Sequence, residues 1–504
     1  MKFRNRLIVV ALLISIIFGV LYIGNRHNEL SEESETGHDN VETVTLWYSD
    51  DSFTDFFINA AVAFHEKYTG IRVIPVLVDS SEYLEVINRA SVKGDNFPDL
   101  FILSNDSLEK AYLAGLASEV TDPGNALSDG YFPKASLDAV TYHNRYVGYP
   151  LSFETSVLLY NKTYLENWAA KINAGGSASE GEGVSAEDMD FEGEDMEVIT
   201  PEVKEDEEEI KNVTYEDYIP ATVDDLLAFA DAYEPEPNVA SVIKWDVSDV
   251  FYNYYFVGNY MIVGGDAGDD AKNINIRNNS TIECMHVYQD LSQFFSIDAE
   301  DSDAEDVLKD FIDGKMVYTI ATSNAIAEIN NANKKAKEEY NEQVREAKIH
   351  NKEIAENPEA GEEELIDIDS IAKPMEYGYA LIPELSSTLR SRSLSVTEAV
   401  VVNGYSECKA SANKVAAFLA NSYSDQLYQR TGKLAASLNA SYTDEGPVTF
   451  QKEYARSIPL PKIVETSNLW VQLEITFTKI WQGEDADAYL KALDDQMRSQ
   501  ISER

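Results

Sequence analysis

One carboxylate in this sequence directly precedes an apolar strand. Residues 148–162 read GYPLSFETSVLLYNK, which predicts an aromatic–proline turn, a polar patch around Glu154 and a buried strand at 157–160. A carboxylate in this position can lie half-buried between two packed bodies, where it would accept charge-assisted hydrogen bonds from a polar ligand. An ordinary strand with one solvated glutamate is the alternative interpretation.

Two aspartates follow predicted strands nearer the start of the chain. The pattern predicts strands at 44–48 and 71–78, helices at 53–68 and 81–92, and a third strand within GDNFPDLFIL. This alternation favours a parallel sheet with helices on both faces, and ligands of such sheets bind beyond the carboxyl ends of the strands. The loops at those ends, 49–52 and 104–107, contain Asp51 and Asp106. Each aspartate is also well placed to cap the helix that follows it.

The composition excludes several classes of function. At 504 residues and 44% apolar content the chain can form two or three globular domains, and its formal net charge of −49 argues against a nucleic-acid partner. The two cysteines, Cys284 and Cys408, are expected to be free thiols in different domains. The sequence contains no HExxH, paired CxxC or GxSxG motif, and in so acidic a chain a carboxylate pair is no evidence for hydrolysis. We therefore expect neither an enzyme nor a bound cofactor or metal.

The first residues predict a membrane segment. Lys2, Arg4 and Arg6 precede an apolar run at 7–23, which is long enough to span a bilayer at roughly 17–25 residues. Neither an A-x-A-like cleavage site nor a cysteine for lipid attachment follows this run. We expect residues 1–27 to be an uncleaved anchor with the body of the protein outside the cell, and 28–42 to be a tether. A cleaved signal peptide is the alternative.

Two charged segments interrupt the predicted domains. Residues 170–215 are rich in Gly, Ser and Glu, which predicts a disordered acidic insertion; calcium buffering is conceivable, but no EF-hand loop motif is present. Residues 330–370 carry a narrow apolar stripe at helical spacing, which predicts a charged helical insertion. This helix either lies against its own domain or binds a partner.

Several motifs, taken in order, resemble one protein family. The runs LWYSDD, YTGIRVIPV and GDNFPDLFILSND, then the 148–162 stretch and YGYALIP, are similar to extracellular solute-binding proteins (family 1) of ABC importers, of the maltose-binding type. The resemblance implies a two-lobe α/β fold, periplasmic-binding-protein-like (type II), with a mostly parallel sheet in each lobe and a hinge of crossing strands. The lobes it implies are an N-lobe at 43–153 plus 397–452 and a C-lobe at 154–396 plus 453–504.

The resemblance also implies which residues line the ligand cleft. They combine hydroxyl-binding groups with aromatic faces, and they are Asp51, Asp106, Glu154, Trp245, Asp249, Tyr252, Asn324 and Trp470. The aromatic block 251–256 is expected to be mostly core, and Trp470 is the position on which family members stack a sugar ring. Leu103, Ser107, Asn324 and Glu474 depart from the maltose pattern, so the resemblance does not imply maltose. Cationic ligands such as polyamines also suit an acidic cleft.

The implied function is capture of a carbohydrate between the lobes and its delivery to ABC permease subunits. The protein would be a monomer held at a Gram-positive-type cell surface. Two alternatives stay open: a membrane-tethered sensor ectodomain of the same fold, and an extracellular glycosidase.

Overall fold

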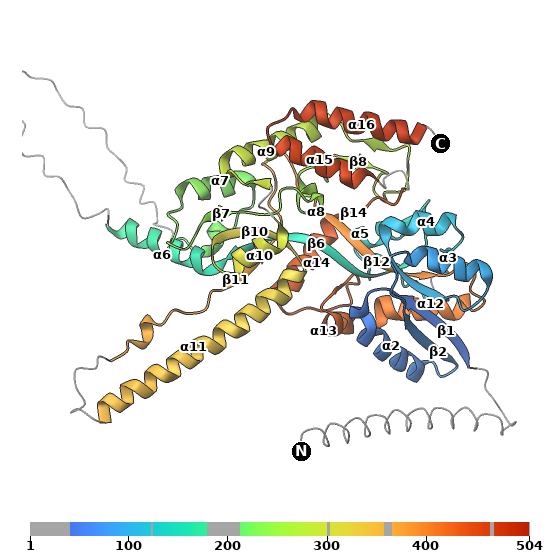
Figure 1. The fold of residues 1–504 in the computed structure, drawn as a ribbon, viewed down its shortest axis with the longest axis horizontal. Coiled ribbons are helices and arrows are strands. Elements are labelled where there is room, and N and C mark those ends of the chain that lie inside the picture. Colours follow the sequence, from blue (N-terminus) through green and yellow to red (C-terminus); the bar gives the residue numbers. More distant parts are fainter. Residues whose placement is uncertain are drawn as a thin grey trace, which may run out of the picture.

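The computed structural model describes residues 41–121, 124–178, 212–299, 303–356, 365–463 and 468–502 (Figure 1). The predicted anchor at 1–27 and nearly all of the predicted tether lie outside the described residues, as does 179–211 of the acidic insertion. Among the residues that are described, no helix combines the length and the apolar character needed to cross a membrane.

The N-lobe has helices on both faces of a sheet. Parallel strands β1 (Glu42–Tyr48), β2 (Ile71–Leu77) and β3 (Leu100–Ser104) lie in the order β2-β1-β3. Its helices include α2 (Thr54–Lys67), α3 (Tyr83–Lys93), α4 (Leu108–Leu113) and α12 (Lys409–Ala417). Successive residues of β3 face opposite ways: Ile102 packs in one core with α2 and α12, and Phe101 in another with α3 and α4. The predicted alternation of strands and helices is confirmed.

Two long strands connect the lobes. β6 (Tyr149–Asn161) begins in the N-lobe, where it pairs with β12 (Leu394–Val402) and β13 (Leu434–Ala435), and ends in the C-lobe. There it pairs with β10 (Met316–Thr322) and β11 (Tyr377–Ala380). Within the described residues one sheet therefore runs through both lobes, in the order β2-β1-β3-β12-β6-β10-β7 (Figure 1).

The predicted mostly parallel sheet of the C-lobe is wrong, because the observed sheet is mixed. β10 runs parallel to β7 (Ser241–Ile243) but antiparallel to β6. The reason is that β6 enters the lobe from the hinge, whereas the lobe's own strand β10 runs back toward it. The C-lobe helices are α6 (Lys162–Ala178), α7 (Val223–Ala232), α8 (Val250–Asn253), α9 (Asn279–Phe295), α10 (Ala304–Ile312), α15 (Leu469–Trp481) and α16 (Ala486–Ser502).

Short elements complete the two lobes and the hinge. They are α5 (Lys134–Ala139), α13 (Leu427–Thr431), α14 (Glu445–Arg456) and β14 (Ile458–Pro459), with the hairpins β4 (Thr141–Tyr142) to β5 (Arg145–Tyr146) and β8 (Ile262–Val263) to β9 (Ile274–Asn275). β14 pairs with the start of β12, so the chain crosses between the lobes a third time.

The helix α14 supports the crossing strands from one side. The ring of Tyr454 stacks on that of Phe153 in β6, with centroids 4.0 Å apart and planes at 5°. Its hydroxyl accepts a hydrogen bond from Ser136 Oγ of α5 at 2.9 Å and lies 2.7 Å from Thr397 Oγ1 of β12. The predicted lobe boundary between residues 452 and 453 falls inside this helix. The boundary is wrong there, because α14 packs under the hinge as a single element.

The acidic insertion begins later in the chain than predicted. The helix α6 continues to Ala178, beyond the predicted start of disorder at residue 170, and the side chain of Asn173 bonds both the N–H and the C=O of Val213. The two ends of the acidic insertion are thus tied together.

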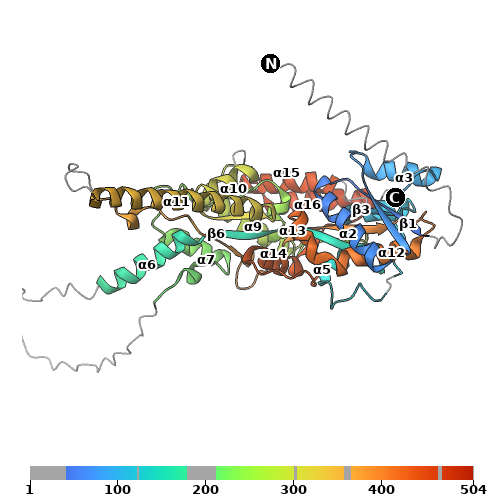
Figure 2. The same cartoon turned by 90° about the horizontal axis from the view of Figure 1, so that it is seen from below.

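The long helix α11 (Asn324–Glu356) extends away from the C-lobe instead of lying against it (Figures 1 and 2). Only the start of the helix, at Ala325, Ile326 and Ile329, belongs to the apolar core next to the hinge. Farther out it is accompanied by its own return segment, where Asn351 bonds the N–H and the C=O of Ile366.

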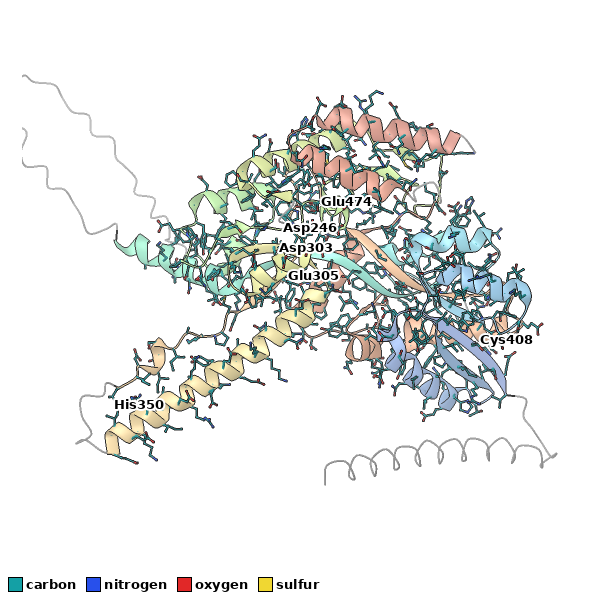
Figure 3. All side chains as sticks on the ribbon, viewed as in Figure 1. Asp246, Asp303, Glu305, His350, Cys408 and Glu474 are labelled. Carbon is teal, nitrogen blue, oxygen red and sulfur yellow. The ribbon has the colours of Figure 1, made fainter. Side chains whose placement is uncertain are left out.

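Both cysteines are free thiols among the described residues, in different lobes as predicted. Cys284 is buried on α9, and Cys408 precedes α12 in the N-lobe (Figure 3).

We predict that Gly258→Ala destabilises the protein. A Cβ atom at Gly258 would lie 2.1 Å from the carbonyl oxygen of Arg392, a backbone atom just before β12. The strand or the turn after α8 would have to move, which costs about 1–3 kcal/mol. Thermal unfolding of the full chain measures this loss. Gly70→Ala is the control, since nothing lies within 4 Å of its added Cβ; equal midpoints for the two variants would contradict the close contact.

Candidate functional site

A pocket lies between the lobes, where the crossing strands meet the C-lobe. It has a volume of about 380 Å³. It is lined by Ser152, Phe153, Glu154, Asp249, Phe251, Tyr252, Thr322, Val396, Glu398 and Lys433. These residues come from β6, β12, α8, the end of β10 and the loop before β13. Inter-lobe pockets are favoured ligand sites, so this is the candidate binding site.

Glu154 sits in the wall of this pocket, held by the C-lobe. One of its carboxylate oxygens accepts the backbone N–H of Ser323 at 2.7 Å, and the other accepts the Ser323 hydroxyl at 2.7 Å. Burial raises the pKa of Glu154, although these two hydrogen bonds oppose the shift. The residue predicted from the apolar strand is thus half-buried between two bodies.

Glu398 lies on the same face of the sheet as Glu154. In the antiparallel pair of β6 and β12, Glu398 is opposite Ser152 and Val396 is opposite Glu154, so Glu154 and Glu398 are diagonal neighbours whose Cα atoms are roughly 7–8 Å apart. The register shifts between Glu398 and Ala399, which marks a β-bulge at this point. Within the described residues the Glu398 carboxylate accepts no hydrogen bond.

The surroundings of Glu398 disfavour its charge. Burial raises its pKa to about 7. The ammonium of Lys433 opposes this shift, whereas the negative charges of Asp106 and Asp50 add to it. This side chain therefore changes its protonation state near neutral pH.

The short helix α8 brings a third carboxylate and two rings to the pocket. Asp249 caps the helix, accepting the N–H of Phe251 at 2.7 Å. Burial raises the pKa of Asp249, and the charges of Asp246 and Glu474, both on the C-lobe (Figure 3), act in the same direction. Burial, together with the nearby carboxylates, raises the pKa of Tyr252 to about 12, so its hydroxyl stays a neutral donor.

Lys433 is the one cation among the described residues that line the pocket. Its Nζ atom lies 2.9 Å from a carboxylate oxygen of Asp50 and 5.3 Å from the ring centroid of Phe53. Asp50 thus already neutralises this ammonium, and the pocket keeps an excess of negative charge. No group of three or more His, Cys, Asp or Glu in the described part of the chain is arranged to hold a metal ion.

The structure brings Glu154, Asp249 and Tyr252 of the predicted residues into one pocket. Asp51 and Asp106 occupy short 3₁₀ turns directly after β1 and β3; both are exposed, and neither lines the pocket. The residue that caps the first turn is Asp50, which accepts the N–H of Ser52.

Trp245 is a core residue and not a cleft residue. It is 1% exposed, its Nε1–H donates to Asn253 Oδ1 at 2.8 Å, and its ring packs edge-on to Trp481 at 5.5 Å. The indole is large and apolar and its one donor is satisfied inside the lobe, so it gains nothing from facing the pocket.

Asn324 and Trp470 do not line the pocket either. Asn324 is exposed at the start of α11, and its neighbour Ser323 makes the contact with Glu154. Trp470 is partly exposed at the start of α15, 6.2 Å from the ring of Tyr254. A stacking role for Trp470 stays a prediction.

The sequence interpretation missed Glu398, Lys433 and Phe251, which line the pocket. Glu398 carried the clearest signal, because it is the single charged residue in the strand sequence LSVTEAVVV. Lys433 carried none, since its place beside the pocket depends on how the segment between α13 and β13 folds back onto β6.

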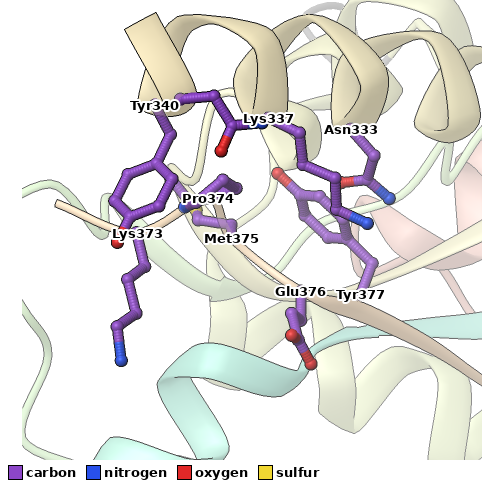
Figure 4. Close-up of a pocket in the computed structure, with 9 residues that line it drawn as sticks. Asn333, Lys337, Tyr340, Lys373, Pro374, Met375, Glu376 and Tyr377 are labelled. Atoms are coloured by element: carbon purple, nitrogen blue, oxygen red, sulfur yellow. The ribbon is translucent and has the colours of Figure 1, made fainter. Parts of the chain in front are cut away.

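A larger hollow, of about 720 Å³, lies along α11 on the outside of the C-lobe. Figure 4 shows Asn333, Lys337 and Tyr340 of α11 facing the segment 373–377. Its charges have both signs, and Glu376 is paired with Lys162. Because no set of side chains of one chemistry converges there, the inter-lobe pocket is the stronger candidate.

We predict that Glu398→Gln stabilises the protein at high pH and not at low pH. The folded-state pKa of about 7 lies above the usual 4.5, so the folded state loses stability relative to the unfolded chain as pH rises from 4.5 through 7. Glutamine removes that loss, which is worth roughly 3 kcal/mol at pH 8. Unfolding measured between pH 4 and pH 8 should show the gain growing with pH. A gain of constant size would contradict it, and Glu346→Gln on the exposed part of α11 is the matched control.

Known structures share this fold. An extracellular solute-binding protein from Staphylococcus aureus in complex with maltose has a TM-score of 0.66 at 17% identity, over 93% of this chain and 99% of that chain. A maltose-binding periplasmic protein from Listeria monocytogenes in complex with maltose gives 0.64 at 19%, over 92% and 99%. A cyclo/maltodextrin-binding protein complexed with maltotetraose gives 0.65 at 17%, over 93% and 99%. At these identities the likeness establishes the fold, and it confirms the predicted two-lobe architecture.

The sequence itself establishes the family. A family profile described as bacterial extracellular solute-binding protein matches residues 59–342, more than half of the 504 residues. This family and the structural neighbours are binding proteins and not enzymes, in agreement with the absence of catalytic motifs. The chain therefore belongs to the family of bacterial extracellular solute-binding proteins.

Proposed function

We propose that this protein captures a carbohydrate in the inter-lobe pocket and presents it to the membrane subunits of an ABC importer. The observation that carries the proposal is the lining of that pocket, which combines the carboxylates Glu154, Asp249 and Glu398 with the rings of Phe251 and Tyr252. Carboxylates bind sugar hydroxyls through charge-assisted hydrogen bonds, and aromatic faces cover the C–H surface of a sugar. The structural neighbours solved with maltose or maltotetraose support the same ligand class.

Closure of the lobes would complete the site. The pocket wall contains residues of both lobes and of the strands that join them, so a hinge motion about β6 and β12 changes its width. A ligand that contacts both walls stabilises the closed form by its extra contacts there. In this proposal the closed monomer, tethered to the cell surface by residues 1–27, is the form that the permease binds.

A sensor ectodomain of the same fold is the second candidate. The observation that favours it is α11, a 33-residue helix that extends beyond the C-lobe and offers a surface for a further partner (Figure 2). Recovery of a histidine kinase in place of permease subunits in a pull-down would favour this candidate over an importer.

We predict that an oligosaccharide stabilises the full-length protein and that Glu154→Gln weakens its binding roughly 10- to 100-fold. A ligand at a hundred times its dissociation constant stabilises by about 2.7 kcal/mol, which a thermal-shift screen of oligosaccharides, amino acids and polyamines detects. The loss follows because a hydrogen bond to a charged group contributes about 1.5–3 kcal/mol.

Titration calorimetry of wild type and Glu154→Gln with the sugar found in the screen measures this loss. The midpoint without ligand reports whether the variant folds, and Glu346→Gln should bind as the wild type does. If no sugar in the screen raises the unfolding temperature, the proposed function is overturned. Unchanged affinity in Glu154→Gln would remove this residue from the site.

A further inference from the structure

We propose that the inter-lobe pocket contains a subsite for a protonated amine, formed by Glu398 with Glu154 and Asp249, and that the captured carbohydrate is an amino sugar. This inference rests on the proposed function and narrows its ligand class.

The lining of the pocket is acidic. Glu154, Asp249 and Glu398 approach one cavity of about 380 Å³ from β6, α8 and β12. Among the described lining residues Lys433 alone is positive, and its ammonium is paired with Asp50 at 2.9 Å. Asp246 and Glu474 lie close enough to Asp249 to act on its ionisation, and they add further negative charge. The pocket therefore has more negative charge than its own cation balances.

The three carboxylates differ in the hydrogen bonds that they accept. Glu154 is held by two hydrogen bonds from Ser323, and one oxygen of Asp249 caps α8. Glu398, by contrast, lies half-buried on the pocket wall and accepts no hydrogen bond within the described residues. A buried charge without a partner is costly, and it is the group that gains most from a ligand cation.

The charge of the ligand determines how well these carboxylates are compensated in the closed pocket. A neutral sugar closing the pocket would exclude water from these carboxylates and leave their charge uncompensated. A primary ammonium supplies one positive charge and three hydrogen-bond donors, which matches carboxylates on different walls. The groups that face Glu398 are Lys433, Asp106, Asp50 and Tyr83, and the raised pKa of Glu398 shows that they leave its charge poorly compensated.

The rings in the pocket favour an amine on a sugar over a linear polyamine. Phe251 and Tyr252 present apolar faces from α8, beside the ammonium subsite, and these faces suit the C–H surface of a sugar ring. The Tyr252 hydroxyl stays neutral and shares a hydrogen bond with Thr322, so together they offer a hydroxyl pair to a sugar hydroxyl.

The test compares disaccharides that carry a hydroxyl, a free amine or an N-acetyl group at the same ring position. Titration calorimetry of the full-length protein, kept in a mild detergent because of the apolar run at 7–23, uses three disaccharides. They are cellobiose, its analogue with two free amines (the glucosamine dimer) and the N-acetylated form of that analogue. Galactosamine oligomers and spermidine complete the panel. We expect an amine-bearing sugar to bind at least tenfold more tightly than its hydroxyl and N-acetyl counterparts, and this preference to decrease with salt.

Glu398→Gln should abolish this preference, because it should weaken binding of the amine-bearing sugar at least tenfold more than binding of its neutral counterparts. The variant is expected to fold, because the wild-type carboxylate accepts no hydrogen bond from the described residues, and its thermal midpoint checks this. Glu346→Gln, which removes one exposed charge from α11, should retain the preference.

The outcomes separate the two proposals. Equal affinity for amine-bearing and neutral sugars overturns the amine subsite while the carbohydrate function stands. Binding of spermidine alone, lost in Glu398→Gln, supports the amine subsite and overturns the carbohydrate function. Binding of neutral sugars alone overturns the amine subsite, and absence of any binding across the panel overturns both.

Discussion

The antiparallel pairing of β6 with β12 holds the two lobes together and sets the position of the pocket. Backbone hydrogen bonds between these strands join the lobes into one sheet, and the register places Glu154 and Glu398 on the same face. The support comes from Tyr454, whose ring stacks on Phe153 and whose hydroxyl contacts Ser136 and Thr397. Because α14 holds both strands at their midpoint, the hinge is a packed element, and the pocket forms beside it.

The carboxylates at this position make the pocket acidic, and they lower the stability of the protein when no ligand is bound. Burial raises the pKa of Glu154, Asp249 and Glu398, so each is less stable as an anion here than in water. Sites that bind ligands often contain such unfavourable groups, because the ligand supplies the missing partner. The stability lost by the empty pocket and the affinity for a suitable ligand thus share one physical origin.

Local sequence patterns were sufficient to predict most helices and strands, but they were insufficient to identify several residues of the site. The alternating apolar residues of β1, the continuous apolar run of β3, and the capping and turn residues between them predict the N-lobe strands and helices correctly. Glu154 could be identified because its position before an apolar strand is visible in sequence. Trp245 could not be excluded from the cleft, because its partners Asn253 and Trp481 meet it only in the folded C-lobe. The path of α11 also escaped prediction, since a narrow apolar stripe suits both packing against a lobe and packing against a return segment.

Short-range patterns of polarity and turn chemistry were enough to predict the α/β class, the order of the N-lobe elements, the family resemblance and Glu154 as a candidate site residue. The tertiary structure alone decided that Glu398, 244 residues after Glu154 in the chain, shares its pocket. It also decided that Lys433 is neutralised by Asp50 and that the C-lobe sheet is mixed. The physical reason is that strand register and the charge balance of a pocket are properties of contacts between distant segments, which no local pattern specifies.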